Sequence, residues 1–349
     1  MDRKDRIEKL IAALQPWYAE CGRRLPWRED PTPYHVWVSE IMLQQTRVET
    51  VIPYYLRFIR EIPDVQALAE ADPEHLQKLW EGLGYYSRVR NLQAAARQIM
   101  QQFSGRFPEN YQDIRSLCGI GDYTAGAIAS ICFGIPVPAV DGNVLRVLSR
   151  ITEDARPISE EKTKKEVRRE LAEAYPEENA GAVTQAIMEL GETVCLPNGA
   201  PSCSLCPCRE FCGSSRGNWM SYPVKTEKKA RRIEALTVFV LRCDGRMALR
   251  KRPEKGLLSG LWELPNCPGH FGEAEALLQA KAWGCEPLDC SAAGKIRHVF
   301  THIEWEMRCF SVSCGSMPPD FAWVSDEELD EAVSLPTAFR KALTALQGK

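Results

Sequence analysis

The stretch that decides the fold of the first part of the chain is LCGIGDYTA, residues 117–125. Apolar residues at helical spacing flank it, and its two glycines, Gly119 and Gly121, predict a tight turn between two helices. Glycines in such a turn let backbone N–H groups approach a phosphate, aided by the positive N-terminus of the second helix. Many ordinary helix pairs also turn on Gly-x-Gly, so the meaning of this turn depends on the residues around it.

Asp141 follows the turn by twenty residues, in the segment AVDGNV, 139–144. It stands where it can cap a helix expected over 143–150. The same carboxylate could instead be held close to a reacting sugar. The two roles are compatible, because a capping side chain is also a rigidly placed one.

Glu40 precedes the turn, in an apolar segment that predicts a helix over 36–59. On such a helix one face would carry Trp37, Glu40, Gln44 and Arg47. A helical glutamate is ordinarily exposed, but apolar neighbours indicate partial burial, which raises a carboxyl pKa above its reference of about 4.3. A carboxyl group kept protonated in this way can act as a general acid.

Five of the 14 cysteines fall close together, at Cys195, Cys203, Cys206, Cys208 and Cys212. Four thiolates on a tight loop suit a [4Fe–4S] cluster or a tetrahedral zinc, and Cys208 is the extra thiol. The set has a single separated Cys-x2-Cys pair and no histidine nearby, which favours the cluster over zinc. Buried cysteines without a metal are the third alternative.

The bulk composition is that of a globular protein. A chain of 349 residues with 44% hydrophobic and 26% charged residues can form two domains. Its apolar runs fall short of the roughly 20 residues that span a bilayer, and its charged first residues do not resemble a secretory signal. We therefore expect a cytoplasmic protein. A net charge of −3 neither indicates nor excludes nucleic-acid binding.

Helical periodicity dominates residues 1–213. The remaining helices expected there cover 7–18, 74–82, 89–103, 124–133, 162–175 and 180–194. Between Arg216 and Arg232 the chain is basic, which is typical of a soluble linker or of a strap over DNA.

Strand patterns begin at Ile233. Ala235–Leu241 is β-branched and apolar, Asp244-Gly245 is a hairpin signal, and Met247–Leu249 continues beyond it. Further elements expected are a loop over 256–265, a helix over 272–283, a strand through Ile303, Trp305 and Met307, and helices over 327–333 and 337–346.

Taken together, these motifs resemble the MutY family of adenine DNA glycosylases, within the iron–sulfur helix-hairpin-helix superfamily. The residues that carry the resemblance are the cysteine set and the segments SEIMLQQTRV (39–48), GLGYYSRVRNL (82–92), GIGDYTAGAI (119–128), AVDGNVLRV (139–147), GLLSGLWELP (256–265) and HVFTHIEW (298–305). The resemblance spans nearly the whole chain.

The resemblance implies a mostly α N-terminal region, a helix-hairpin-helix barrel plus a helical [4Fe–4S] module, and a C-terminal α/β Nudix-like domain. The domains expected are a glycosylase domain with its cluster over 1–213, a basic linker over 214–232 and an 8-oxoguanine recognition domain over 233–349. The cluster ligands would be Cys195, Cys203, Cys206 and Cys212. The first cysteine gap is x7 where the family commonly has x6, and Cys118 stands where this hairpin usually has proline.

The resemblance also implies a chemistry. Glu40 would protonate adenine N7, Asp141 would stabilise an oxocarbenium-like sugar, and Tyr123 and Asn143 would support that centre. Residues lining the adenine pocket would be Trp27, Arg28 and Gln185. Taken alone, Arg28 could equally be a surface charge.

A base inside a duplex must leave the stack before it can react. By resemblance, Gln45 and Tyr85 would wedge into the duplex, and the further DNA contacts would be Gln44, Thr46, Leu83, Gly119 and Gly121. Leu83 and Tyr85 could instead be core residues.

The partner base, 8-oxoguanine, would be recognised by Phe300 through stacking, and by Thr301 and His302 through hydrogen bonds. Many relatives have Ser at the position of Thr301, which keeps the hydroxyl. Taken alone, His302 is typical of a structural histidine in a strand.

Three rival functions compete with this interpretation. A glycosylase/lyase of the endonuclease III type would need a lysine where Tyr123 stands, and tyrosine cannot form its Schiff base. A Nudix pyrophosphohydrolase needs a dense carboxylate helix for magnesium, which LPNCPGHFGEAEALL after Glu263 lacks. A catalytically dead DNA-binding protein would not need Glu40, Tyr123, Asp141 and Asn143 together. We expect a monomeric, nucleoid-associated bacterial enzyme acting on duplexes with A:8-oxoguanine or A:G mispairs.

Overall fold

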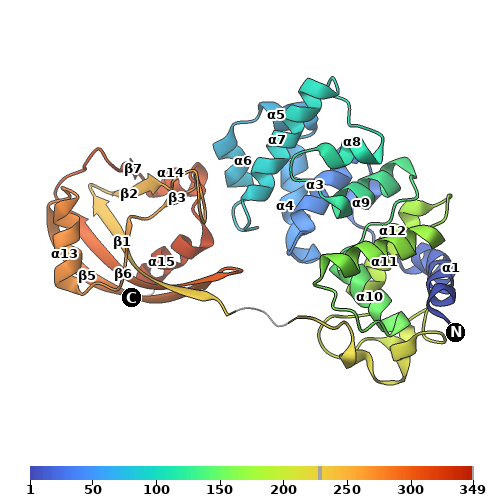
Figure 1. Cartoon of the computed structure of the whole chain (residues 1–349). Helices are drawn as coiled ribbons and strands as arrows, with labels where there is room; N and C mark the ends of the chain where they lie inside the picture. The colour runs from blue at the N-terminus through green and yellow to red at the C-terminus, as the bar shows by residue number, and fades with distance from the viewer. Residues whose placement is uncertain (227–229, 348–349) are drawn as a thin grey trace. The chain divides into compact units, whose positions relative to one another are not determined.

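The computed structural model describes residues 1–226 and 230–347. The chain divides into two compact units, Met1–Ala71 with Arg90–Glu227, and Asp72–Val89 with Lys228–Lys349. Residues 72–89 are therefore grouped with the C-terminal unit, although the sequence placed them in a continuous 1–213 domain. The predicted linker 214–232 includes residues 227–229, which lie outside the described residues, as do the last two of the predicted 233–349 domain (grey in Figure 1).

The first unit is helical (Figure 1). Its α-helices are α1 (Arg3–Cys21), α2 (Pro26–Glu29), α3 (Pro33–Leu43), α4 (Val48–Glu61), α5 (Val65–Glu70), α7 (Ser87–Gln102, beginning in the other unit), α8 (Tyr111–Ser116), α9 (Asp122–Phe133), α10 (Gly142–Thr152), α11 (Glu161–Ala174) and α12 (Ala180–Thr193). Three 3-10 turns follow, η1 (Cys203–Leu205), η2 (Gly213–Arg216) and η3 (Trp219–Ser221). The mostly helical prediction is confirmed.

Side-chain caps set the start of several of these helices. The oxygen of an Asp, Asn or Thr accepts a hydrogen bond from a backbone N–H in the first turn, which satisfies a donor that the helix leaves free. The residues that cap in this way are Asp2 (α1), Thr32 (α3), Asp64 (α5), Asn110 (α8) and Asp141 (α10). Since short polar residues recur at these positions, helix starts were predictable to within a few residues.

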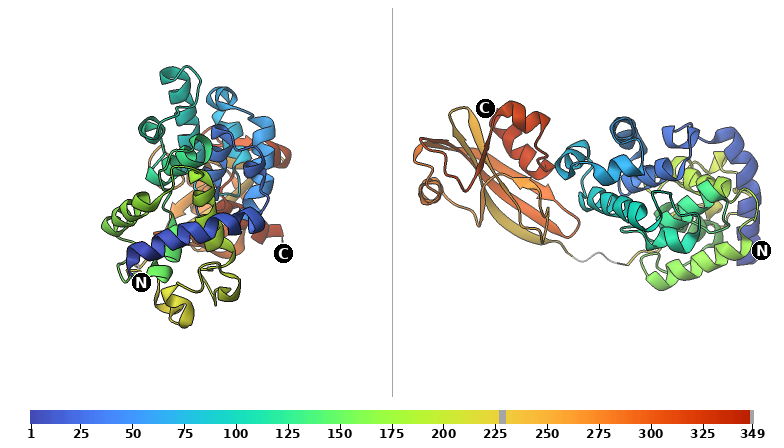
Figure 2. Two further views of the ribbon diagram at one scale, coloured as in Figure 1. Left: turned by 90° about the vertical axis from the view of Figure 1, so that its right-hand side faces the viewer. Right: turned by 90° about the horizontal axis from the view of Figure 1, so that it is seen from above.

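Helices α1, α10, α11 and α12 share one apolar core, and Figure 2 shows α1 in blue running across this group. Its residues include Leu10 and Leu14 of α1, Leu148 of α10 and Leu190 of α12. Cys208 is also part of it, fully buried. The N-terminal helix is therefore packed against the helices that carry Asp141 and Gln185.

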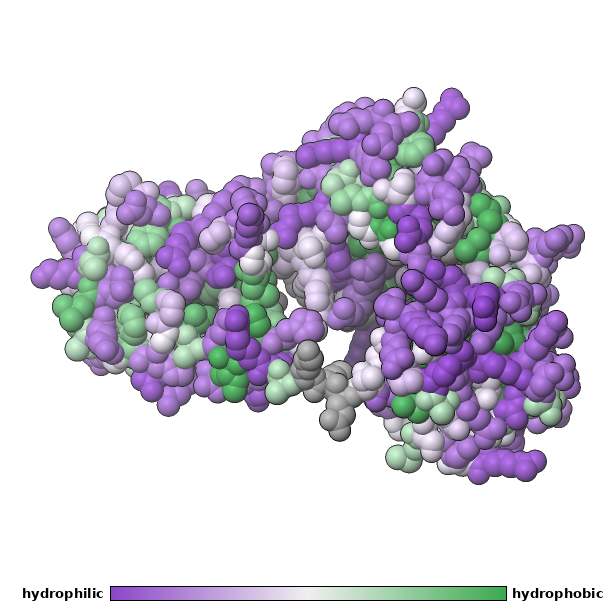
Figure 3. Space-filling model, viewed as in Figure 1, coloured by the Kyte–Doolittle hydropathy of each residue, from purple (hydrophilic) through white to green (hydrophobic). Residues whose placement is uncertain are grey.

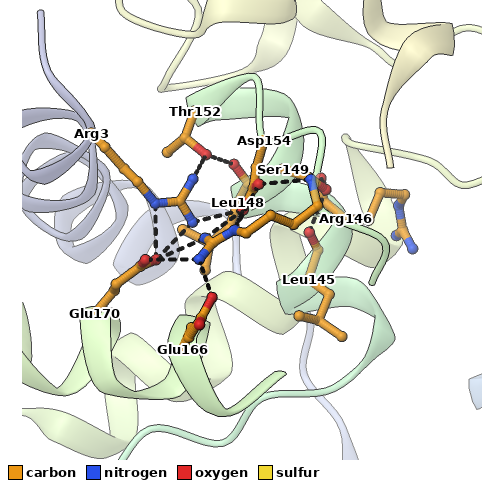
Figure 4. A network of polar contacts seen from close by, with 10 residues as sticks. Arg3, Leu145, Arg146, Leu148, Ser149, Thr152, Asp154, Glu166 and Glu170 are labelled. Carbon is orange, nitrogen blue, oxygen red and sulfur yellow. Dashed lines mark hydrogen bonds and ion pairs between the residues drawn. The ribbon is translucent and has the colours of Figure 1, made fainter. Parts of the chain in front are cut away.

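Charged side chains fasten the N-terminal end of α1 to α11. Arg3 and Arg156 both pair with Glu170 and with Asp154, at N–O separations of 2.7 to 3.2 Å (Figure 4). Arg156 also pairs with Glu166 at 2.8 Å. A partly buried network of this kind is screened less by salt than isolated surface pairs are.

Two features of the helical region differ from the prediction. The expected helix over 36–59 is interrupted, because α3 ends at Leu43 and α4 begins at Val48. Short helices α2, α5 and α8 were not predicted, since four to six residues are too few to display helical periodicity.

The second unit contains a mixed sheet. Among the described residues, seven strands pair in the order β3-β2-β1-β6-β5, with β4 also on β1 and β7 on β2. The strands are β1 (Arg232–Cys243), β2 (Arg246–Lys251), β3 (Trp262–Glu263), β4 (Asn266–Pro268), β5 (Pro287–Val299), β6 (Ile303–Cys314) and β7 (Ala322–Val324). β1 and β6 run parallel, and the other pairs are antiparallel. The predicted hairpin at Asp244-Gly245 joins β1 to β2.

Helices cover both faces of this sheet. Along β1, Val238 and Val240 face a core with α14 (Asp326–Glu331) and α15 (Thr337–Gln347), while Phe239 and Leu241 face α13 (Glu273–Ala282). Successive strand residues point to opposite faces, so a strand buried on both sides reads as a continuous apolar run, as this one does. The predicted α/β fold of the C-terminal domain is confirmed.

Helix α6 (Pro73–Leu79) and the residues after it dock on the C-terminal helices within this unit. Lys78 donates to the Val333 carbonyl at 3.0 Å, and Arg340 pairs with Glu81 at 2.7 Å. These polar contacts explain why residues 72–89 are grouped with the C-terminal part of the chain.

The surface is largely hydrophilic on the face drawn in Figure 3, with apolar residues in small separate groups. Within residues 1–226 and 230–347, every helix is too short or too polar to cross a membrane.

Candidate functional site

Glu40 is buried near the C-terminal end of α3, with only 6% of the residue exposed. Apolar side chains on both sides of it, such as Val36 and Ile41, are buried too. This burial raises the pKa of the Glu40 carboxyl to about 7. A substantial part of the Glu40 population therefore carries a proton at neutral pH, as the sequence predicted.

Tyr123, the second residue of α9, donates a hydrogen bond from its hydroxyl to Glu40 Oε2 at 2.5 Å. Burial is the main cause that raises the Glu40 pKa, this bond opposes it, and the negative charge of Asp141 adds to it. Burial also raises the pKa of Tyr123 well above its ordinary value. Tyr123 is therefore a neutral hydrogen-bond donor.

Asp141 caps α10, because its Oδ1 accepts a hydrogen bond from the Val144 N–H at 2.7 Å. Its Oδ2 accepts from Asn143 Nδ2 at 2.9 Å. Burial raises the pKa of Asp141, and these two hydrogen bonds oppose that shift. The capping interpretation is confirmed, and it leaves the carboxylate close enough to Glu40 for its negative charge to raise the Glu40 pKa.

The predicted stripe of Trp37, Glu40, Gln44 and Arg47 is wrong in its second half. Gln44 ends α3, and Arg47 is the residue that precedes α4. Gln45 has φ of 60°, in the left-handed region that costs a residue with a side chain about 1 kcal/mol or more. Gln44, Gln45 and Thr46 therefore form a turn directly after the helix that holds Glu40, and the Gln45 side chain is exposed.

The turn between α8 and α9 contains both glycines of the opening motif. Gly119 has φ of 74°, and a Cβ atom there would lie 2.6 Å from Asn91 Cβ, so only glycine fits. Gly121 precedes α9, a Cβ atom there would meet open space, and none of the described side chains caps α9. The Cys118 N–H donates to Gln98 Oε1 at 3.1 Å, a bond that a proline at this position would lack.

Trp27 and Arg28 lie on the short helix α2. Trp27 is buried edge-on against Tyr55, with ring centroids 5.3 Å apart. Arg28 is not a free surface charge, since it pairs with Glu189 at 2.9 Å and lies over the ring of Tyr18. Its positive charge also lowers the pKa of Glu40, which places Arg28 near that carboxyl group.

Gln185 lies on α12 and accepts a hydrogen bond from the Tyr18 hydroxyl at 3.1 Å. Three further side chains of α12 reach the site and were missed in the sequence: Met188, Glu189 and Glu192. A helical glutamate is expected to be solvated. The one signal for them was their spacing from Gln185, at i+3, i+4 and i+7 on one helix face.

Residues Leu83 and Tyr85 have different environments. Leu83 is buried in the core, as the alternative interpretation proposed. Tyr85 is 46% exposed, has φ of 47°, and its hydroxyl lies 2.8 Å from Thr301 Oγ1 within the second unit. An exposed aromatic residue in a strained backbone conformation is more typical of a functional position than of a core one.

Phe300, Thr301 and His302 form the turn between β5 and β6. Thr301 and His302 are exposed, so His302 is not the structural strand histidine of the alternative interpretation. Phe300 is half-buried and packs edge-on against Trp305, with centroids 4.9 Å apart. The turn therefore exposes the polar side chains of Thr301 and His302 beside the packed rings of Phe300 and Trp305.

Cys195, Cys203, Cys206 and Cys212 line one cavity behind α10 and α12, together with Arg150 and Trp219. Cys208 is not part of this lining and packs in the helical core instead. Arg150 donates to Cys195 Sγ at 3.3 Å. The four cysteines selected by spacing therefore line one cavity in the fold.

Comparison with known proteins decides the family. Residues 38–177 match the HhH-GPD superfamily of base excision DNA repair proteins, and residues 237–345 match the NUDIX domain. The adenine DNA glycosylase of Mus musculus is 35% identical, over 94% of this chain and 76% of its own. That of Homo sapiens is 34% identical, over 97% and 74%. The chain belongs to the adenine DNA glycosylase family.

Solved structures agree on the fold of the helical unit of this adenine DNA glycosylase. A thermostable thymine-DNA glycosylase superposes with a TM-score of 0.55 at 22% identity, covering 61% of this chain and 97% of its own. A DNA-trapped endonuclease III gives 0.54 at 20%, covering 62% and 99%.

The chain is therefore an adenine-specific DNA glycosylase of base excision repair. Such an enzyme must break an N-glycosidic bond. Two buried carboxyl groups lie in the candidate site, and burial raises the pKa of each. Glu40 accepts a hydrogen bond from Tyr123, whereas Asp141 accepts hydrogen bonds from the Val144 N–H and from Asn143.

The Nudix-like domain of this glycosylase uses Glu263 for structure. Glu263 is 2% exposed, pairs with Arg250 at 2.7 Å and also with Arg252, and accepts from Asn266 Nδ2 at 2.8 Å. Its charge is therefore neutralised within the domain.

Proposed function

We propose that this glycosylase removes adenine opposite 8-oxoguanine, or opposite guanine, and leaves an abasic site without cutting the strand. The observation that carries the proposal is the arrangement of Tyr123, Glu40 and Asp141. The neutral Tyr123 hydroxyl donates a hydrogen bond to the Glu40 carboxyl. Asp141, which caps α10, lies close enough for its charge to act on Glu40.

The first step is proton transfer from Glu40 to adenine N7. The C1′–N9 bond then breaks, and its electron pair leaves with the neutral base. The sugar becomes an oxocarbenium-like cation, and the negative charge of Asp141 stabilises it, either as an ion pair or as a transient ester. Water adds to C1′ and gives a proton to the Glu40 carboxylate, which restores the acid and completes hydrolysis.

Tyr123 and Asn143 support this chemistry. Tyr123 fixes the Glu40 carboxyl by its 2.5 Å hydrogen bond, and Asn143 fixes Asp141 through its 2.9 Å bond. Asn143 is in turn held by Arg146, which donates to its Oδ1 at 2.8 Å. Rigid placement of both carboxyl groups reduces the reorganisation that the reaction would otherwise need.

Base recognition would use Trp27, Arg28 and Gln185. Trp27 offers an apolar aromatic surface, whereas Arg28 and Gln185 offer hydrogen-bonding groups close to the catalytic carboxyls. A flipped base is normally read by a few placed polar groups and by stacking.

Duplex binding would use the α8–α9 turn and the two strained residues. The uncapped N-terminus of α9 can donate backbone hydrogen bonds to a phosphate, and open space over Gly121 permits close approach. Gln45 and Tyr85, both exposed and both left-handed, would enter the base stack, with Gln44 and Thr46 beside the first of them. Leu83, two residues before Tyr85, is buried.

Recognition of 8-oxoguanine would fall to the β5–β6 turn. Phe300 would stack on the lesion, and Thr301 and His302 would hydrogen-bond the groups that distinguish it from guanine. The exposure of Thr301 and His302 supports their role. We also propose that the enzyme acts as a monomer in the cytoplasm, on nucleoid DNA.

The cysteine-lined cavity fits a [4Fe–4S] cluster, which we propose as the cofactor. Four sulfurs around one zinc must lie within about 4 Å of one another, since each Zn–S bond is about 2.3 Å. Within the described ranges, no three Cys, His, Asp or Glu side chains are grouped closely enough for one ion, yet four thiols line a single cavity. Four thiols around a shared cavity suit a cube of iron and sulfide.

Cys195, Cys203, Cys206 and Cys212 would ligate the cluster, and Arg150 would offset part of the negative charge of the thiolates. When bound, the cluster would cross-link the end of α12 to the 203–212 loop. Base excision itself is redox-neutral.

The test is single-turnover excision from a labelled duplex with adenine opposite 8-oxoguanine, compared with an adenine–thymine duplex. Each sample is divided between alkaline and neutral work-up. Strand breaks that need alkali, only in the lesion duplex, support the proposal. Breaks without alkali, or efficient borohydride trapping of the enzyme on DNA, would show a lyase; no release of adenine by cluster-loaded enzyme would refute the substrate.

A further inference from the structure

One face of α12 carries four polar or polarisable side chains that contact the active site: Gln185, Met188, Glu189 and Glu192. Gln185 binds Tyr18, Met188 lies 3.8 Å from the Tyr123 hydroxyl, Glu189 binds Arg28, and Glu192 binds Arg23. None of these contacts is needed to describe the proton transfer itself.

Glu189 is the most deeply placed member, with no exposed surface. It accepts hydrogen bonds from the Arg23 side chain at 2.5 and 3.0 Å and from the Arg23 backbone N–H at 3.2 Å. It also pairs with Arg28 at 2.9 Å. Burial alone would raise the pKa of Glu189, but the bonds and charges of Arg23 and Arg28 hold it below its ordinary value. Glu189 is therefore a buried carboxylate that organises two arginines.

Arg28 is held on three sides as a result. Its guanidinium pairs with Glu189, donates to the Arg23 carbonyl at 3.1 Å, and lies 5.5 Å from the centroid of the Tyr18 ring. An arginine on a four-residue helix would otherwise sample many rotamers, because its side chain is long and flexible. The three contacts fix the direction in which its remaining N–H groups point.

Tyr18 links Arg28 to Gln185. Its ring supports the Arg28 guanidinium, while its hydroxyl donates to Gln185 Oε1 at 3.1 Å. An amide that is bonded at its oxygen has a defined orientation, with the NH2 group on the opposite side. Arg28 and Gln185, which the sequence predicted as pocket residues, are thus oriented by Glu189 and Tyr18, which it did not predict.

We propose that Glu189 and Tyr18 are positioning residues of the base pocket, which hold Arg28 and Gln185 in the orientation that receives the flipped adenine. This inference rests on the proposed function of Arg28 and Gln185. It deepens that function, because it makes the orientation of the two base-recognising side chains depend on the buried carboxylate of Glu189 on α12 and the phenol of Tyr18 on α1.

The test uses Glu189→Gln and Tyr18→Phe, each of which keeps shape and removes one property. Single-turnover excision is measured at saturating enzyme, and duplex affinity is measured separately. Glu178→Gln, an exposed glutamate just before α12, is the matched control. We expect Glu189→Gln to slow excision about 100-fold, which is typical of a misplaced reacting group. Tyr18→Phe should slow it about 3- to 10-fold, as expected for one lost neutral hydrogen bond. Duplex affinity should stay within about twofold.

Double variants separate positioning from a general structural role. If Glu189 acts through Arg28, Glu189→Gln adds little to the loss caused by Arg28→Gln. In the same way, Tyr18→Phe adds little to Gln185→Leu. Full additivity in both pairs, or wild-type excision rates in both single variants, would overturn the proposal. If Glu189→Gln does not fold, Tyr18→Phe decides, and a wild-type rate for it refutes the inference.

Failure of the proposed substrate is a separate result. A wild-type enzyme that ignores 8-oxoguanine but removes adenine opposite guanine refutes only that preference, and the double-variant comparison is then made on the A:G duplex.

Discussion

The hydroxyl of Tyr123 lies 2.5 Å from Oε2 of Glu40, so that a phenol from α9 holds the acid of α3. Both groups are buried, and burial raises the pKa of each. A lysine in place of this phenol would bring a competing positive charge to the acid. The tyrosine instead orients the acid and leaves it able to keep its proton.

Tyr123→Phe should move the basic limb of the excision profile to higher pH. The hydrogen bond from Tyr123 stabilises ionised Glu40 and so lowers a pKa that stands at about 7. Without it, Glu40 keeps its proton to higher pH, and the limb at which the rate falls shifts upward. Single-turnover rates between pH 5.5 and 9 measure this, with Tyr111→Phe, outside the site, as control. A limb that stays in place or moves to lower pH contradicts the assignment.

Glu40→Gln should abolish excision and stabilise the fold above pH 7. The pKa of Glu40 is about 7 in the folded enzyme against an ordinary 4.5, so the folded state binds more protons between these values. Wild-type stability therefore falls as pH rises through this window. A neutral amide avoids that cost, which amounts to about 3 kcal/mol at pH 8 at 1.36 kcal/mol per pKa unit.

Urea unfolding at pH 8 and at pH 4.5 measures the effect. The difference in unfolding free energy between Glu40→Gln and wild type should be large at pH 8 and small at pH 4.5. An inactive variant that is less stable at pH 8 would show that Glu40 is ionised in the resting enzyme.

Sequence patterns predicted the helix starts and strands whose residues follow a regular pattern. Asp141 was found as a cap because a short polar residue precedes a periodic segment, and the run at Ala235–Leu241 because a doubly covered strand is apolar throughout. The break between α3 and α4 was missed because it contains neither Gly nor Pro and is made by Gln45 in a left-handed conformation.

Long-range contacts account for the remaining failures. Strand β5 was missed because its residues, such as Ser291 and Lys295, are mostly exposed, and the strand is specified by pairing with β6. Glu189 was missed because its partners Arg23 and Arg28 lie more than 160 positions away in the chain. A buried charge is recognisable only when its counter-charges are known.

Cys206→Ser should remove the cluster, whereas Cys208→Ala should keep it. Cys206 lines the shared cavity and Cys208 does not, although the two are only two residues apart. Visible absorbance and iron content of the purified variants measure this. Loss of iron in Cys208→Ala with retention in Cys206→Ser would reverse the ligand assignment.

His302→Ala should reduce the preference for adenine opposite 8-oxoguanine over adenine opposite guanine by about tenfold, the effect of about 1.4 kcal/mol of lost hydrogen bonding. His302 is exposed in the β5–β6 turn, so its removal leaves the domain core intact. Ser291→Ala, exposed on β5, is the control. Equal losses on both duplexes would indicate a general DNA contact and not recognition of the lesion.

Glu263→Gln should destabilise the Nudix-like domain by about 3–5 kcal/mol, the usual cost of leaving a buried charge without its partner. Glu263 is 2% exposed and is bound by Arg250, Arg252 and Asn266. A glutamine keeps two hydrogen-bonding atoms but leaves two arginines without a counter-charge. Thermal unfolding of the full-length enzyme, followed by tryptophan fluorescence, should show a transition at lower temperature, while excision at low temperature persists. The matched control is Glu254→Gln. If Glu263→Gln instead kept wild-type stability and abolished a magnesium-dependent nucleotide hydrolysis, Glu263 would be a catalytic ligand and the domain would be an enzyme in its own right.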